Sequence, residues 1–160
     1  MPPEWISFEL QRRVDHQFND VRRAVTSPAV LGTGMTMPLG RAGLAVLQAP
    51  LRPASFPYEP ALHAPATLTS IRGRRVALVR LEITTWSEHE TAISLRPLSS
   101  RPDRWSPRRV QQYFGLAHAC ADLVARLIAE ETAARSVSDI PIESDRLATR
   151  HRPHLGAGTA

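Results

Sequence analysis

The sequence contains no lysine. All 20 of its basic residues are arginines, and 15 acidic residues leave a formal net charge of +5. A surface that binds nucleic acid usually mixes both basic residue types and interleaves them with aromatic rings. Here the arginines are scattered as single residues and pairs, such as Arg12 with Arg13 and Arg22 with Arg23. The composition therefore argues against nucleic acid as the partner.

Cysteine is almost as scarce, because Cys120 is the only one in the chain. One thiol cannot form a disulfide within the chain. Cys120 lies in an apolar stretch of a predicted helix, where small cysteines are common core residues. We therefore predict a buried side chain and not a nucleophile.

Long apolar runs are absent as well. No stretch approaches the length needed to cross a bilayer, and the N-terminus MPPEWISFELQRR has an early acid and no apolar core of a signal peptide. The sequence predicts a cytoplasmic protein without a membrane span.

Motifs for cofactors and metals are missing too. The segment LGTGMTMPLG lacks the GK[ST] ending of a phosphate loop, and the histidines lack zinc-ligand spacing. Glu88, His89 and Glu90 form a polar break that is typical of a solvated turn. We predict no cofactor and no metal.

Apolar and polar residues alternate in WISFELQRRV, which predicts a half-buried strand. Its apolar face carries Ile6, Phe8, Leu10 and Val14. Arg12 interrupts that face. Asp15 is the predicted N-cap of a short helix that ends before Ser27 and Pro28. Its apolar residues follow at helical spacing and are Phe18, Val21 and Val25.

Residues 29–65 are apolar but interrupted by glycine and proline, which predicts short strands joined by turns. The proline-rich part, residues 50–65, is predicted to be a loop or an extended surface segment. A strand at ATLTSI and a turn at RGR are expected to follow.

A long β-hairpin is predicted from RVALVRLEITTW, the break SEHE and TAISLRPL. In its first strand the inward face is expected to carry Ala77, Val79, Leu81 and Ile83, and the outward face Arg80, Glu82 and Thr84. Val76 and Leu78 are expected to add apolar area to the outward face. Ile93 and Leu95 are the predicted inward pair of the second strand, which Pro97 ends.

A long helix is predicted after Ser106, the expected N-cap, and Pro107, the expected first helical residue. A broad apolar stripe follows at steps of three and four residues and includes Val110, Tyr113, Phe114, Ala117, Ala121, Val124 and Ile128. So broad a face must pack on something large, and the strands are the candidate. After about residue 132 the pattern fades, which predicts a mostly disordered tail.

The predicted order is strand, short helix, antiparallel strands and one long C-terminal helix. This order, with the entry into the first helix at Val14 and Asp15 and the helix RRVQQYFGLAHACADLVARLI, resembles the START-like helix-grip superfamily. That superfamily includes polyketide cyclases, lipid-transfer proteins and many uncharacterised bacterial members. Residues 29–65 depart from it, because they are too short and proline-rich for a full set of strands and a second helix.

The resemblance implies an α+β fold with a curved antiparallel sheet wrapped around one long C-terminal helix, and a short helix after the first strand. It divides the chain into a helix-grip-like domain, residues 1–131, and a tail, residues 132–160. It also implies a cavity between sheet and helix that binds an apolar or aromatic small molecule. The expected ligand-binding residues are Phe8, Leu10, Arg12, Leu81, Ile83, Trp86, Ile93, Leu95, Tyr113 and Ala117.

Several alternatives stay open. Arg12 is either a polar anchor for a ligand or a residue whose stem covers the core while its head reaches solvent or an acid. His118 and Asp122 can meet on one helix face, either as half of an acid–base site or as a solvated pair. A non-enzymatic binding protein, monomeric or homodimeric, is favoured. The rival functions are a protein-interaction module with a filled cavity and a cyclase- or aromatase-like enzyme.

Overall fold

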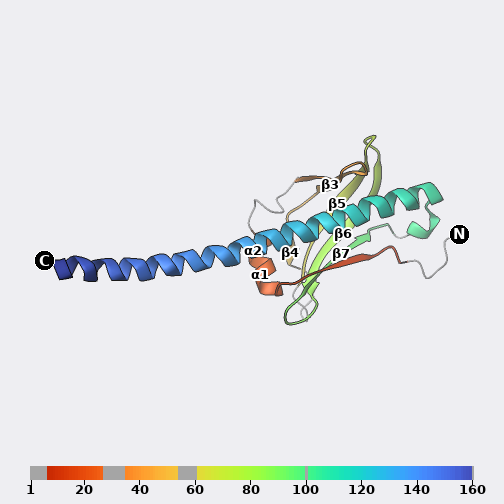
Figure 1. Ribbon diagram of the computed structural model, residues 1–160. Helices are drawn as coiled ribbons and strands as arrows, with labels where there is room; N and C mark the ends of the chain where they lie inside the picture. The colour runs from red at the N-terminus through yellow and green to blue at the C-terminus, as the bar shows by residue number, and fades with distance from the viewer. Residues whose placement is uncertain (1–6, 27–34, 54–60, 100, 160) are drawn as a thin grey trace.

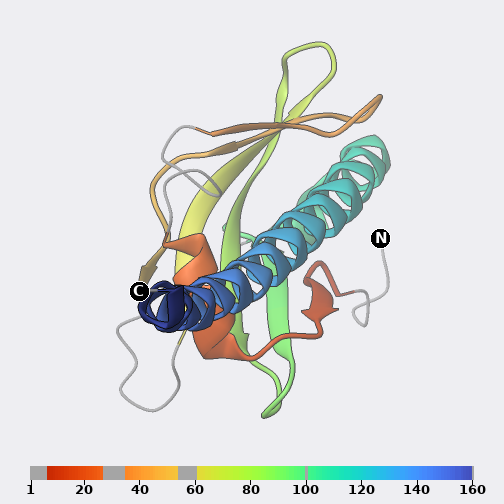
Figure 2. The ribbon, with the colours of Figure 1, turned by 60° about the vertical axis from the view of Figure 1, so that its left-hand side comes forward.

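A curved antiparallel sheet wraps around one long helix in the computed structural model of the protein (Figures 1 and 2). The structure describes residues 7–26, 35–53, 61–99 and 101–159, and the side chains of the last helix up to Ser136. The helix is α2, Pro107–Thr159, and the short helix α1, Phe18–Val25, follows the first strand. The predicted α+β fold is confirmed.

The sheet has the order β1-β7-β6-β5-β3-β2, and β4 pairs with β5 beside β3. All of its pairs are antiparallel. The strands are β1 Leu10–Val14, β2 Thr36–Pro38, β3 Gly43–Leu47, β4 Arg52–Pro53, β5 Ala61–Ser70, β6 Arg75–Thr85 and β7 Thr91–Pro97. The 3-10 turn η1, Pro102–Arg104, precedes α2.

The chain turns from β1 into α1 over three residues. Gln17, not Asp15, occupies the N-cap position, and no side chain caps the helix there, so the predicted cap at Asp15 is wrong. Asp15 lies too early because the chain needs Asp15 to Gln17 to reverse direction. The Thr91 hydroxyl donates to the His16 carbonyl at 2.8 Å and ties this turn to β7. The predicted apolar face of α1 is buried.

Arg52 and Pro53 form β4 and are exposed, which agrees with the predicted extended surface segment. Residues 61–65 begin β5, and Leu62 and Ala64 are buried there, so the prediction of a loop or a surface segment is wrong for residues 61–65. Residues 54–60 lie outside the described residues. Short strands joined by turns are confirmed for β2 and β3. Of the described part of residues 29–65, none is helical.

Pro65 explains why β5 is hard to recognise in the sequence. It lies inside a strand that is paired on both sides, where a missing N–H group normally breaks the ladder. The Pro65 carbonyl accepts from the Gln48 N–H at 2.9 Å, so its backbone edge faces the gap between the end of β3 at Leu47 and the start of β4 at Arg52. The proline therefore costs no hydrogen bond to β6.

The inward face of β6 is confirmed, because Ala77, Val79, Leu81 and Ile83 are all buried and Leu78 is exposed. Ile93 and Leu95 of β7 lie opposite Ile83 and Leu81 in register and are equally buried.

Val76 departs from the predicted outward face. Leu68 pairs with Ala77 but Thr69 pairs with Arg75, so β6 has one extra residue at this point, a β-bulge. The bulge turns Val76 inward, and its side chain is buried. The strand alternation alone could not predict this reversal.

Helix α2 begins as predicted. The Ser106 hydroxyl accepts from the Arg109 N–H at 3.2 Å, and Pro107 is the first helical residue. The apolar stripe of α2 packs on the concave face of the sheet as far as Ile128 and Thr132, and α1 and β1 cover its flank (Figure 2). The helix continues to Thr159 and extends past the sheet (Figure 1). The predicted domain division at residue 132 stays a prediction.

Candidate functional site

Eight of the ten residues predicted to bind a ligand, all except Arg12 and Trp86, lie together in the core between the sheet and α2. Ile83, Ile93, Leu95, Tyr113 and Ala117 are 0% exposed. Leu81 and Leu10 are also buried, and Phe8 packs against the same cluster while partly exposed. The predicted grouping of these side chains is therefore what the fold produces.

Among the described residues, the fully buried members of this group pack against one another without space beside them. An exposed fraction of zero means that no space large enough for a water molecule adjoins the side chain. At the centre of the concave face, side chains of β6, β7 and α2 all have an exposed fraction of zero. Close packing of this kind is the normal state of a protein interior.

Four aromatic rings fill the end of the core near the start of α2. Phe8 stacks on Phe114 with 5.6 Å between ring centroids, and Trp105 meets Tyr113 edge-on at 5.3 Å. The Tyr113 hydroxyl donates to the Phe8 carbonyl at 2.6 Å. Burial, reinforced by the nearby Glu9 carboxylate, raises the pKa of Tyr113 well above its usual range. This phenol therefore stays protonated as a structural donor.

Arg12 lies on the inner side of β1, as predicted, and its head reaches two residues of α2. Its Nε donates to Asp122 Oδ1 at 2.6 Å, and its Nη2 to His118 Nδ1 at 2.9 Å. Because a guanidinium can only donate, Nδ1 of His118 accepts and the ring proton is on Nε2. The Arg12 head also donates to the Gln11 carbonyl. The second interpretation of Arg12, a head that reaches an acid, describes this arrangement.

Trp86 lies away from the core. It follows β6 at the start of the hairpin turn, where its N–H donates to the Glu90 carbonyl, and its side chain is 48% exposed. The Arg13 guanidinium lies 4.7 Å from the centre of its ring. Trp86 is therefore on the rim of the sheet, separated from the other predicted ligand-binding residues.

Cys120 is a core side chain, as predicted. Burial raises the pKa of its thiol to about 12, so the nucleophilic thiolate is not formed near neutral pH. In the part of the chain that the structure describes, no three His, Cys, Asp or Glu residues come close enough to hold a metal ion.

A site that the sequence analysis missed lies at the protein surface beside the start of α2. Two adjoining surface hollows, of about 330 and 390 Å³, lie between the β5–β6 turn, the β2–β3 turn and the first turns of α2. They share Ser70, Arg72, Arg108 and Gln112. The arginines that line them are Arg41, Arg72, Arg74, Arg75, Arg108 and Arg109. We call these two hollows together the arginine hollow.

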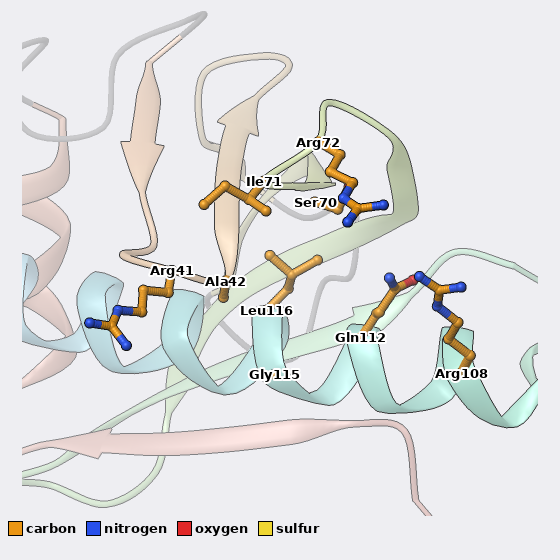
Figure 3. Close-up of a pocket in the computed structure, with 9 residues that line it drawn as sticks. All are labelled: Arg41, Ala42, Ser70, Ile71, Arg72, Arg108, Gln112, Gly115 and Leu116. Atoms are coloured by element: carbon orange, nitrogen blue, oxygen red, sulfur yellow. The ribbon is translucent and has the colours of Figure 1, made fainter.

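Figure 3 shows how the arginine hollow is assembled. Arg72 points from the β5–β6 turn toward α2, and Arg108 points from α2 toward the turn. Arg41 lies at the opposite end, beside the β2–β3 turn, while Ile71 and Leu116 lie between them. Three segments that are distant in the sequence therefore supply one cationic site.

The sequence did contain a signal for this site, the two clusters SIRGRR and SPRR. Each resembles the scattered arginine pairs elsewhere in the chain. Only the antiparallel pairing of β5 with β6, and the crossing of α2 over them, brings the clusters to one place.

Comparison with models of known protein families gives no match, and none of the curated proteins matches the chain significantly. Within the described residues, no helix combines the length and the apolar character that crossing a membrane requires.

Proposed function

We propose that the protein is a non-enzymatic binding module in which the sheet and α2 form a packed scaffold and the ligand binds at the surface, in the arginine hollow. The observation that carries this proposal is that the interior is packed, whereas the arginine hollow is open to solvent. The side chains at the centre of the interface between the sheet and α2 are fully buried, whereas the arginine hollow is open and lined by six arginines. Ligand sites are concave regions with a few convergent polar groups.

Membership of the START-like helix-grip superfamily is part of this proposal. A sheet curled around one helix is compatible with that superfamily. In this chain the interior that would hold an apolar ligand is filled by Tyr113 and its aromatic neighbours. The filled core favours surface binding over an interior apolar ligand.

The non-enzymatic part of the proposal is supported by the contacts of four titratable side chains. The two α2 residues that could act as acid and base, His118 and Asp122, are both held by Arg12. The phenol of Tyr113 and the thiol of Cys120 are protonated and buried. None of these four groups faces the arginine hollow.

Native mass spectrometry of the purified protein, combined with thermal shift, tests the proposal. We expect the mass of the chain without a co-purified apolar molecule. We also expect no rise in Tm with fatty acids or aromatic polyketides and a clear rise with multiply charged anions, since a ligand selective for the folded state stabilises it. A co-purified apolar ligand would overturn the proposal in favour of an interior cavity.

A further inference from the structure

The β5–β6 turn presents its arginines from a fixed backbone. The Ser70 N–H donates to the Arg74 carbonyl at 2.8 Å, and the Gly73 N–H donates to the Ser70 carbonyl at 2.9 Å. The Ser70 hydroxyl also accepts from the Arg74 N–H at 3.2 Å. Gly73 has φ +85°, a conformation that glycine adopts without strain. Arg72 and Arg74 therefore start from a hydrogen-bonded turn, which lowers the entropy cost of binding.

Arg109 is held in place from two sides. Its Nε donates to the carbonyl of Val76, the bulge residue, at 3.0 Å, and its guanidinium lies 4.4 Å from the centre of the Trp105 ring. Its two terminal nitrogens make no other hydrogen bond within the described residues. This group is thus oriented by the protein with donors left for a ligand.

The positive charge of the arginine hollow is not compensated by the protein. None of the residues that line it is an Asp or a Glu. Across the described ranges, no carboxylate lies within ion-pair distance of any of the six guanidinium groups. The first turn of α2 adds the positive end of a helix dipole beside Ser106. Like charges gathered in this way repel one another until an anion binds between them.

Gly115 lines the arginine hollow without a side chain. It lies in α2, its backbone does not need glycine, and a Cβ added there would meet nothing within 4 Å. An exposed helical glycine costs about 1 kcal/mol relative to alanine. The fold therefore does not require glycine at this position, and a side chain added there would face the arginine hollow.

We propose that the arginine hollow binds a compact, multiply charged phosphate ligand of the oligophosphate class, an inference that rests on the proposed function and names its ligand. Guanidinium groups bind phosphate oxygens in pairs of parallel hydrogen bonds. Five of the six arginines, all except Arg41, line one hollow of about 390 Å³, which matches an anion that carries several charges on neighbouring atoms. The carboxylates of an acidic peptide are spread too widely for that.

The lining favours a free oligophosphate over a nucleic acid. No aromatic side chain lines either hollow. Proteins that hold single strands stack the bases on aromatic rings. A site without such rings has no means of holding a base, so we expect inorganic triphosphate and a nucleoside triphosphate to bind with similar affinity.

Isothermal titration with inorganic triphosphate tests this inference. We expect one ligand per chain, and we expect Arg72→Ala and Arg108→Ala each to weaken binding about tenfold or more, because each removes a charge-assisted contact. Arg126→Ala is the matched control, since Arg126 is an exposed residue of the same helix that lines neither hollow. Its affinity should change less than about twofold.

Three outcomes would overturn the inference. One is no binding of triphosphate, and another is equal weakening by all three variants, which would indicate attraction to net charge alone. The third is tighter binding of duplex DNA, single-stranded DNA or polyglutamate at Arg72 and Arg108 with no competition from triphosphate. That result would replace the ligand class but leave surface binding intact, whereas an apolar molecule found in the core would overturn the proposed function itself.

Discussion

Two arginine sites border α2, and they differ in the source of the acceptor for their positive charge. Arg12 reaches α2 from β1, and the helix supplies Asp122 and His118 as its acceptors. The arginines beside the first turns of α2 surround a hollow whose walls contain no acid. The first site is complete within the chain, and the second needs an acceptor from outside.

An arginine whose charge is already paired with an acceptor in the chain has a structural role. An arginine without such an acceptor is available to bind a ligand. Both sites are open to solvent, so burial alone would not distinguish them. Substitutions at completed contacts should change stability, whereas substitutions in the arginine hollow should change binding. The following predictions test this division.

The largest effect is expected at Tyr113, in the packed region. Tyr113→Ala removes a fully buried ring and the donor to the Phe8 carbonyl. We expect the free energy of unfolding to fall by about 3 to 5 kcal/mol, as for other large-to-small core substitutions. Urea denaturation measures it. A loss below about 1 kcal/mol would mean that the core is loosely packed and could admit a ligand after all.

A second effect concerns pH and Cys120. The folded thiol keeps its proton up to a pKa of about 12, whereas the thiol of the unfolded chain ionises at about 9. Ionisation then favours the unfolded chain, so the free energy of unfolding falls as pH rises from about 9 to about 12, by up to about 1.4 kcal/mol per pH unit. Tyr113 contributes in the same direction.

Cys120→Ala isolates the contribution of the thiol. Denaturation of the variant at several alkaline pH values should show a shallower decline than that of the unsubstituted protein, with no difference in slope below pH about 8. Parallel curves throughout would show that the thiol is accessible to water in the folded protein.

A smaller effect is expected for the completed arginine site. A double-mutant cycle with Arg12→Ala and Asp122→Asn should give a coupling of less than about 1 kcal/mol, because the Asp122 side chain is 65% exposed and solvent screens the pair. Neither variant should alter the affinity for triphosphate. A change in that affinity would show that the two arginine sites are not independent.

The smallest effect on stability is expected in the arginine hollow. Arg72→Ala and Arg108→Ala each remove one of six mutually repelling charges and break no ion pair with a described residue. We expect a change within about 0.5 kcal/mol in thermal unfolding without ligand, as for most surface substitutions. A marked loss of stability would instead assign these side chains a structural role.

The sequence predicted the parts of the fold that depend on local periodicity. The inward faces of β6 and β7 and the start of α2 at Ser106 follow from residue spacing. The predictions from the sequence were wrong at Pro65 and Val76, because the structure there depends on how a neighbouring strand pairs. Proline is tolerated in β5 because of the gap between β3 and β4, and Val76 turns inward because of the bulge opposite Thr69.

The candidate site was less predictable than the fold for the same reason. The arginines of SIRGRR and SPRR are 30 or more residues apart, and no local pattern shows that they share a hollow. Whether an arginine has an acid beside it is likewise a property of the folded chain. Arg12 is unusual in sequence, yet its charge is satisfied, whereas Arg72 and Arg108 are unremarkable in sequence and lack an acid partner among the described residues.

The most direct test of the central claim uses position 115, which lines the arginine hollow and where an added Cβ would meet nothing within 4 Å. Gly115→Glu and Gly115→Gln add side chains of similar size, and both should stabilise α2 relative to glycine. The affinity of each variant for inorganic triphosphate is the quantity to measure. We expect Gly115→Glu to bind at least about tenfold more weakly than Gly115→Gln, since its carboxylate competes for the guanidinium groups. Equal affinities would contradict the claim that the arginine hollow is the site of binding.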